Sequence, residues 1–417
     1  MRNWAGNHTY RASRLLEPQS IEELQEAVRG ATRLRVIGSR HSFNDVADTD
    51  GALVSLARMP KVFQPDTSSS TVTVDGATRY GDFCEPLHRA GLALHNMASL
   101  PHISVVGACA TGTHGSGARS GNLATAVVEA EVVRADGELA RVTSAHTEEL
   151  RAAAVSLGCL GVITRITLAV EPTYQVRQDV FEDLSLDAFV EHFEGIAAMG
   201  DSVSFFTEWG DRAIDQVWIK RRVDADGGEP IARLFEATPA TVERHPIRGF
   251  PPDACTPQLG VPGPWFERLP HFRMDHTPSS GDELQSEYFV GADRAPNAFL
   301  SLNQLRTVIA PLIQVTEVRS IAADDLPVSP ASGRPSVAFH FTWKPDLPAV
   351  RQLLPTIERA LEPFEPRPHW GKLFTLAPEA VRSRYPRLRE FVAVAEAFDP
   401  AGAFRNAFVQ RYVFDAG

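Results

Sequence analysis

A short apolar strand that runs into a glycine turn constrains this chain more than any other stretch. Leu34, Val36 and Ile37 are apolar, and Gly38 follows them directly. A β-branched apolar run closed by glycine predicts a buried strand that enters a tight turn. The residues after Gly38 are small or hydroxylated, so their backbone N–H groups can form a concave anion site. His41 stands in this turn, where its imidazole either meets solvent or faces a phosphate-bearing ligand.

A second stretch of small residues, 96–117, strengthens the ligand interpretation. It is rich in Gly, Ala, Ser and Thr, so it offers mainly backbone and hydroxyl groups. Such a surface lets a large flat ligand approach the main chain closely. The alternative is an irregular loop that needs its glycines for turns.

Composition, charge and cysteine spacing exclude several classes of protein. At 417 residues the chain is long enough for two or three domains of roughly 150 residues each. Its net charge of -11 disfavours nucleic acid and anionic membranes as partners. No apolar run approaches the roughly 18 residues of a membrane helix, and the N-terminus lacks a signal-peptide core. A cytoplasmic protein without a zinc framework is expected, because four cysteines are scattered without CxxC spacing: Cys84, Cys109, Cys159 and Cys255.

Residues 1–172 mix helix and strand signals. Ser20, with Glu23 three residues later, predicts a capping box that opens a helix ending near Val28. Further strands are expected at 53–56, 71–76, 127–134, 139–143 and 162–168, and a helix at 80–90 that Gly91 ends. A domain boundary is expected near Glu171 and Pro172.

The second half of the chain predicts an α+β domain over 173–365. Alternating segments at 203–207 and 216–220 are typical of strands, and a helix is expected at about 293–310. A terminal segment, 366–417, contains a turn that could return to the first domain.

Two further strands place polar side chains between aromatic ones. Glu317 and Arg319 share one face of a strand, as do His340 and Thr342. A carboxylate beside a guanidinium, with an imidazole near, suits a substrate that carries several hydroxyls. The alternative is a buried ion pair with a core histidine. Lys372 follows a later tight turn, and a surface lysine is the commoner case there.

Together these motifs resemble the bacterial alditol (xylitol) oxidases of the vanillyl-alcohol-oxidase flavoprotein superfamily. The resemblance covers nearly the whole chain and rests on Gly38-Ser-Arg-His-Ser-Phe-Asn44, Met97-Ala-Ser-Leu-Pro-His-Ile-Ser104, Thr111-Gly-Thr-His-Gly-Ser-Gly117, Glu317-x-Arg319 and Pro368-His-Trp-Gly-Lys372. It implies a two-domain α+β FAD-linked oxidase. A PCMH-type FAD-binding domain would comprise 1–172, with 366–417 completing the active site, and 173–365 would form the substrate cap domain.

The resemblance also implies roles for individual residues. His41 would bond covalently to the flavin, and the other FAD contacts would be Gly38, Ser39, Arg40, Ser42, Phe43, Ser99, Ser104, Gly107, Ala110, Thr111, Gly112, Thr113 and Val162. The polyol would meet Ser99, Glu317, Arg319, Thr342 and Lys372. The catalytic set would be Glu317, Arg319, His340 and Lys372, with no metal. Arg40 departs from the small residue expected beside the attachment histidine.

The implied reaction oxidises the terminal C1 hydroxyl of alditols such as xylitol and sorbitol to the aldose. Hydride would pass to flavin N5, and O2 would be reduced to H2O2 by an enzyme expected to be a monomer. By chemical type His340 is the expected base, with Glu317 as the alternative. Lys372 would stabilise negative charge on the reduced flavin. Small Ala98 is expected to leave space for oxygen.

Other functions compete with this interpretation. A sugar-lactone oxidase, or a dehydrogenase of the same superfamily, would keep the flavin and change the substrate or acceptor. A nicotinamide dehydrogenase is disfavoured because no G-x-G-x-x-G follows the first strand. A metal hydrolase is disfavoured because the 13 histidines show no H-E-x-x-H spacing. A non-catalytic flavin or sugar binder would use the same polar groups for affinity alone.

Overall fold

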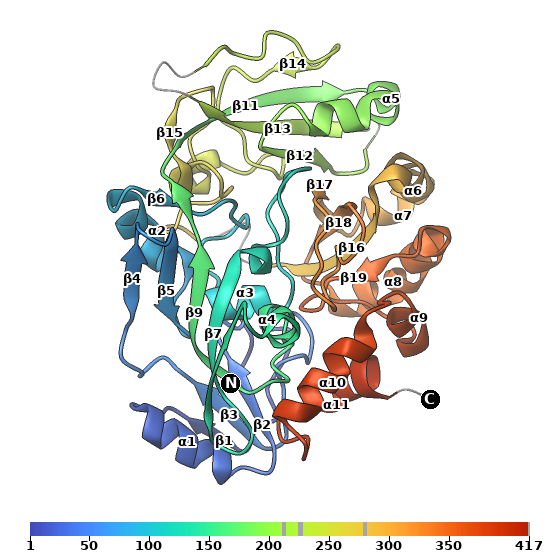
Figure 1. The fold of residues 1–417 in the computed structure, drawn as a ribbon. Helices are drawn as coiled ribbons and strands as arrows, with labels where there is room; N and C mark the ends of the chain where they lie inside the picture. Colours follow the sequence, from blue (N-terminus) through green and yellow to red (C-terminus); the bar gives the residue numbers. More distant parts are fainter. Residues whose placement is uncertain (211–213, 224–227, 278–281, 416–417) are drawn as a thin grey trace.

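The chain folds into an α+β architecture with small sheets at one end and a large sheet at the other (Figure 1). The computed structural model describes residues 1–210, 214–223, 228–277 and 282–415. Strands β1 to β9 belong to the small sheets, whereas β11 to β19 form the large one.

The strand and turn at 34–38 belong to a three-stranded parallel sheet. Its order is β1-β3-β2, with β1 at Arg14–Leu16, β3 at Ala52–Ser55 and β2 at Leu34–Ile37. Helix α1 (Ile21–Arg29) covers this sheet and begins at the predicted cap, since Glu23 N donates to Ser20 Oγ at 3.2 Å. The reciprocal bond differs from a capping box, because the Glu23 carboxylate accepts from Gln19 N at 2.8 Å.

A five-stranded antiparallel sheet stands next to it in the order β4-β5-β9-β7-β8. The strands are Phe63–Asp66, Thr71–Asp75, Val162–Ala169, Val127–Val133 and Leu139–Thr143. The associated helices are α2 (Tyr80–Arg89), α3 (Val105–Ala110), the 3-10 helix Leu123–Ala126 and α4 (Thr147–Ala154), and β6 (Leu92–Ala93) pairs with β10 (Glu171–Pro172). The predicted hairpin turn is confirmed, because Gly137 adopts a φ of 80° between β7 and β8.

Among the described residues, the large antiparallel sheet has nine strands, in the order β14-β11-β13-β12-β17-β18-β16-β19, with β15 on β11. These are Thr238–Pro239, Gln175–Leu184, Ile214–Val223, Ser202–Thr207, Ile313–Ile321, Ser336–Trp343, Leu284–Gly291, Arg367–Pro368 and Gly263–Pro264. Its helices are α5 (Leu186–Ala197), α6 (Ala295–Asn303), α7 (Arg306–Ile309) and α8 (Leu347–Leu361). Short 3-10 helices lie at Pro252–Ala254, Trp265–Glu267, Ala292–Arg294 and Glu362–Phe364.

The single helix predicted at about 293–310 is wrong in detail. Helix α6 ends where Leu305 N donates to Leu302 O at 2.8 Å. This bond spans three residues, as in a 3-10 helix, and not the four of an α-helix. This tight turn breaks the α-helical ladder, and the short α7 begins after it.

The C-terminal segment returns to the first sheet. Helices α9 (Pro378–Ser383), α10 (Leu388–Phe398) and α11 (Ala407–Val409), with the π-helix Gln410–Phe414, bring it back beside β2 (Figure 1). Leu34 N donates to Ala403 O at 2.8 Å, and the buried Arg35 guanidinium donates to Phe404 O at 2.7 Å. The C-terminal segment is therefore hydrogen-bonded to the N-terminal three-stranded sheet.

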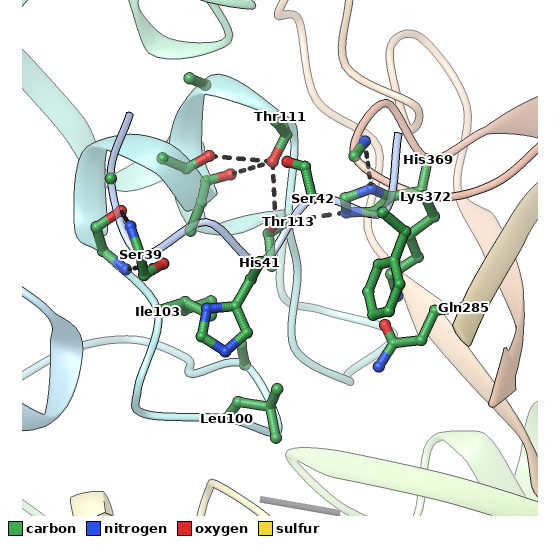
Figure 2. A pocket seen from close by; sticks show the side chains of 18 of the residues that line it. Ser39, His41, Ser42, Leu100, Ile103, Thr111, Thr113, Gln285, His369 and Lys372 are labelled. Carbon is green, nitrogen blue, oxygen red and sulfur yellow. Dashed lines mark hydrogen bonds between the residues drawn. The ribbon is translucent and has the colours of Figure 1, made fainter. Parts of the chain in front are cut away.

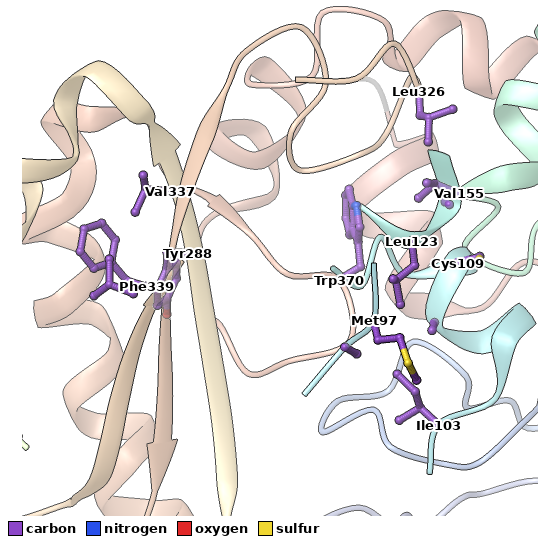
Figure 3. Close-up of a cluster of buried hydrophobic side chains, with 14 of the residues drawn as sticks. Met97, Ile103, Cys109, Leu123, Val155, Tyr288, Leu326, Val337, Phe339 and Trp370 are labelled. Carbon is purple, nitrogen blue, oxygen red and sulfur yellow. The ribbon is translucent and has the colours of Figure 1, made fainter. Parts of the chain in front are cut away.

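Buried side chains from three parts of the chain share one core (Figure 3). Met97 and Ile103 come from the small-residue stretch, Trp370 from the C-terminal segment, and Tyr288 and Phe339 from the large sheet. The Trp370 Nε1–H donates to Val328 O at 2.8 Å, which satisfies its polar group inside the core. The cavity described next lies where these parts meet.

No helix in the described part of the chain is long and apolar enough to cross a bilayer.

Candidate active site

One elongated cavity joins the small sheets to the large sheet. Its empty volume is about 1770 Å³, part of it open to solvent. One wall is built from residues within the segments 35–43, 98–114 and 156–163, and the opposite wall comes from β16, β17, β18 and the turn before Lys372. Figure 2 shows His41 on the first wall and Lys372 with His369 on the second.

Nearly all of the predicted site residues line this cavity. Gly112 and Val162 do not. The Gly112 backbone packs near Pro330, and the Val162 side chain is fully buried in the core of β9. Their chain neighbours do line the cavity, namely Thr111, Thr113, Gly161 and Ile163.

The glycine turn and the small-residue stretch are joined side by side. Ser104 N donates to Ser39 Oγ at 3.1 Å, and Ser39 N donates to Ser104 Oγ at 3.4 Å. A Cβ built on Gly38 or on Gly107 would collide with the Ser104 side chain. At Gly38 the two segments approach so closely that a larger residue would displace Ser104, and at Gly107 a side chain would displace the Ser104 hydroxyl of the same segment.

His41 has no hydrogen-bond partner within the described polypeptide, although both ring nitrogens are buried. Its ring stacks on Trp4 with centroids 4.9 Å apart. Burial, together with nearby His102, lowers the pKa of His41 to about 4, so the imidazole is neutral at physiological pH. Buried polar groups are nearly always satisfied, so two unpaired ring nitrogens indicate a group that the polypeptide does not supply.

Arg40 shows how a bulky cation fits beside that histidine. Its backbone adopts a φ of 62°, in the left-handed region, and its carbonyl accepts from Trp4 N at 2.9 Å. The exposed guanidinium donates to Arg2 O at 3.3 Å. The Arg40 side chain thus contacts the N-terminal segment, and it does not displace the His41 ring from its stacking contact with Trp4.

Three neighbouring strands of the large sheet carry the polar end of the cavity. In the strand register, His340 on β18 lies between Glu317 on β17 and Glu287 on β16. One step along the same face, Thr342 pairs with Gln285. The sequence predicted the polar pairs of β17 and β18, and the sheet places a third pair beside them.

Glu287 is the centre of this cluster of polar side chains. Its carboxylate meets Lys372 Nζ at 2.7 Å, Arg319 Nη2 at 2.7 Å and His114 Nε2 at 3.2 Å. Burial alone would raise the pKa of Glu287, but Lys372, His114 and Arg319 hold it well below its usual value. Glu287 is therefore a buried, ionised carboxylate.

Lys372 and His340 form a close pair beside it. The distance from Lys372 Nζ to His340 Nδ1 is 2.5 Å, and His340 Nε2 lies 3.1 Å from Thr342 Oγ1. Burial lowers the pKa of Lys372, an effect that Glu287 opposes. Burial and the neighbouring Lys372 charge lower the pKa of His340 to about 4.

Glu317 is held from behind by a histidine and from the side by an arginine. Its Oε1 lies 2.7 Å from His271 Nε2, and its Oε2 lies 3.5 Å from Arg319 Nε. Burial would raise the pKa of Glu317, but Arg319 and His271 bring it below its usual value. Arg319 Nη1 also donates to Ser99 Oγ at 3.4 Å, so Ser99 joins the polar group.

Several residues of the site were not predicted: His114, His271, Gln285, Glu287 and His369. A signal for two of them exists in the sequence. Gln285 and Glu287 stand two residues apart in a strand-like segment, the same spacing as Glu317 and Arg319. The histidines come from loops, and no periodicity marks them.

Within the described residues, no group of three or more His, Cys, Asp and Glu side chains is arranged to hold a metal ion.

Comparisons with known proteins agree with this geometry. Residues 12–143 match a family model described as an FAD binding domain, and residues 283–412 match one described as D-arabinono-1,4-lactone oxidase. The alditol oxidase of Streptomyces sp. (strain IKD472 / FERM P-14339) is 47% identical over 98% of this chain and 97% of its own length. The chain belongs to the alditol oxidase family. As a member it is an FAD-dependent oxidoreductase, and the expected two-domain α+β fold and FAD cofactor are confirmed.

More distant relatives also match this member of the alditol oxidase family over nearly its whole length. L-gulono-1,4-lactone dehydrogenase of Mycobacterium tuberculosis is 28% identical over 98% of both chains. L-gulonolactone oxidase of Bos taurus is 25% identical over 99% of this chain and 98% of its own length.

Proposed function

We propose that this enzyme oxidises the terminal C1 hydroxyl of alditols such as xylitol and sorbitol to the aldose and produces H2O2. The observation that carries the proposal is the polar end of the cavity, where donors and acceptors for several hydroxyls converge on three adjacent strands. Bound FAD would be held by the small-residue wall and would supply the hydride acceptor, its N5 atom, and the route for electrons to O2. The remaining steps belong to the side chains.

The charge of the polar group favours a neutral substrate. With Lys372 protonated, the cations Arg319 and Lys372 balance the carboxylates of Glu287 and Glu317 in ion pairs of 2.7, 2.7 and 3.5 Å. A charged sugar acid would leave one buried charge unpaired, which is costly, whereas a polyol needs only donors and acceptors. An alditol meets this requirement.

The substrate contacts follow from which atoms have hydrogen-bonding capacity left. Glu317 accepts from an inner hydroxyl with the lone pairs that His271 and Arg319 leave free, and Arg319 donates to a neighbouring one. Ser99 and Thr342 add hydroxyl contacts at either side. Holding the chain of hydroxyls at several points fixes the C1–H, and this positioning lowers the barrier.

His340 is the proposed proton acceptor, with Lys372 as its partner. Glu317 is the poorer base because Arg319 and His271 stabilise its ionised form, whereas part of the lowering of the His340 pKa comes from the Lys372 charge and is lost when Lys372 is neutral. When Lys372 is charged it donates to His340 Nδ1, so Nε2 carries the ring proton. When Lys372 is neutral it accepts from Nδ1–H, and Nε2 then takes the hydroxyl proton. The pair titrates as one unit, and proton uptake restores a cation that stabilises negative charge in the cavity.

The FAD contacts are proposed at the small-residue wall. Gly38, Ser39, Ser104 and Gly107 form a surface of backbone and hydroxyl groups that admits close approach. The unpaired His41 nitrogens support a covalent bond from this imidazole to the flavin. The remaining predicted contacts at this wall are Arg40, Ser42, Phe43, Ser99, Ala110, Thr111, Gly112, Thr113 and Val162.

Acid precipitation tests the covalent bond. The purified yellow protein is precipitated with trichloroacetic acid, and flavin absorbance is measured in the pellet. Colour in the pellet is the expected result, and its loss in His41→Ala identifies the attachment site. A colourless wild-type pellet would rule out the bond while leaving FAD binding intact.

Peroxide production tests the substrate class. Xylitol and sorbitol are supplied in air, and peroxide is measured against L-gulono-1,4-lactone and D-arabinono-1,4-lactone. The second candidate, a sugar-lactone oxidase or dehydrogenase, is favoured by the lactone oxidase model that matches residues 283–412. Turnover of lactones but not of alditols would select it, and turnover with an artificial acceptor but without O2 consumption would select the dehydrogenase.

The division of the chain is proposed on the same basis. Residues 1–172 and 366–417 would form the FAD-binding domain, and 173–365 the substrate domain, because the C-terminal segment bonds to β2. The net charge of -11 and the scattered cysteines support the proposal of a cytoplasmic protein that binds neither nucleic acid nor membrane. A monomer is proposed from the family resemblance alone.

A further inference from the structure

A buried lysine outside the cavity contacts the site from behind. Lys220 on β13 is 1% exposed and does not line the cavity. Its Nζ has three partners: Leu269 O at 2.6 Å, Pro270 O at 2.9 Å and His271 Nδ1 at 3.0 Å. An ammonium group has three N–H donors and no acceptor, so all three contacts are accounted for when Lys220 is charged.

This pattern fixes the tautomer of His271. Because Nδ1 accepts from Lys220, the ring proton lies on Nε2, which donates to Glu317 Oε1 at 2.7 Å. Phe206 and Trp218 pack edge-on against the His271 ring, with centroids at 5.6 and 5.1 Å, and hold its plane. A continuous chain therefore runs from Lys220 through His271 to Glu317.

We propose that Lys220 and His271 are positioning residues that hold the Glu317 carboxylate, ionised and oriented, for the hydroxyls of the polyol. The inference rests on the proposed function and adds two residues that support the substrate-binding carboxylate. Lys220 acts through His271 and touches no substrate.

Charges on every neighbouring element bear on this chain. Glu317 and Arg319 face it from β17, and Arg268 and Cys255 face it from the segment before β16. Burial lowers the pKa of Lys220 to about 7, although Glu317 opposes the shift. Burial and the Lys220 charge lower the pKa of His271 to about 4, so loss of that charge raises it.

The test replaces Lys220 with methionine, which keeps the length of the side chain and removes its donors. Lys220→Met should raise the KM for xylitol about ten-fold, equivalent to about 1.4 kcal/mol, with little change in kcat, because Glu317 binds hydroxyls in both ground and transition states. Lys344→Met is the matched control, since that exposed lysine also donates to a carbonyl, Pro311 O at 2.8 Å, away from the cavity. It should match wild type.

The pH profile separates positioning from a merely structural role. The ratio of variant KM to wild-type KM should be largest below about pH 7 and shrink above it, because wild-type Lys220 loses its own proton there. A lysine needed only for folding would give a ratio independent of pH. Lys220→Met should also add nothing to the KM of His271→Leu, because both changes break the same chain.

If Lys220→Met does not fold, the His271 variants decide. His271→Gln keeps an N–H that reaches Glu317 and should retain a KM near wild type, whereas His271→Leu should raise it. Equal KM values for the two variants, or a Lys220→Met KM equal to wild type, overturn the inference while alditol turnover stands. Absence of peroxide from the wild-type enzyme with every alditol overturns the proposed function instead.

Discussion

Removal of the charge on Glu287 offers the sharpest perturbation of the site. Glu287→Gln keeps the shape of the side chain, but its amide NH2 faces Lys372 Nζ, where Oε2 lies at 2.7 Å in the native protein. Arg319 Nη2 keeps one acceptor, at 2.7 Å, without the charge. Two buried cations thereby lose their common counter-ion.

The expected magnitude follows from those two contacts. Breaking a buried ion pair costs about 3–5 kcal/mol of stability, because the remaining charge is left uncompensated. A hydrogen bond to a charged group contributes about 1.5–3 kcal/mol, so misplacing Lys372 and Arg319 should lower kcat/KM by roughly 10- to 100-fold. The polyol contacts of the substituted enzyme would remain but would no longer be held in position.

The pH profile of kcat/KM should also shift along the pH axis, which a general loss of structure would not cause. Glu287 raises the pKa of Lys372 against the effect of burial, so its neutralisation lowers that pKa further. The proposed base needs neutral Lys372. The rise of kcat/KM with pH should therefore move to lower pH in Glu287→Gln, even though the maximum falls.

Urea unfolding and initial-rate kinetics with xylitol measure both effects. Glu358→Gln is the matched control, because Glu358 is also a buried carboxylate but binds Tyr288 OH at 2.8 Å outside the cavity. Its kcat/KM should match wild type. A Glu287→Gln enzyme whose kcat/KM stays within about two-fold of wild type, or whose pH profile moves to higher pH, would refute the reasoning.

Three further predictions concern the same cavity. Lys372→Arg should lose at least about 100-fold of kcat/KM between pH 6 and 9, because a guanidinium keeps its proton at every working pH; a profile that still rises with pH would contradict the Lys372–His340 pair. Ala98→Leu should slow reoxidation by O2 roughly ten-fold in stopped-flow experiments and affect reduction by xylitol less; an unchanged reoxidation rate would remove the oxygen role of Ala98. The free energy of unfolding should fall as pH drops from about 6.5 toward 4, because His41, His271 and His340 have folded pKa values of about 4 and the unfolded chain binds more protons in that window; chemical denaturation at several pH values measures the slope, and stability that rises on acidification would contradict it.

Local sequence determined most of the strands and the two polar pairs on β17 and β18. The apolar run at Leu34–Ile37 forms β2 with the predicted bounds, and the alternation at Ser336–Trp343 forms β18. These segments were predictable because strand periodicity and glycine turns are local properties of the chain. The same periodicity placed Glu317 with Arg319 and His340 with Thr342 on shared faces.

Only the tertiary structure decided which polar groups meet. Glu287 joins Lys372, Arg319 and His114 because β16 pairs with β18, and this pairing is set by packing between segments far apart in sequence. In the sequence, nothing distinguishes Lys220 from an ordinary strand residue, and only the folded structure buries it against His271. Burial and neighbouring charge, which set the pKa values of these groups, do not exist before the chain has folded.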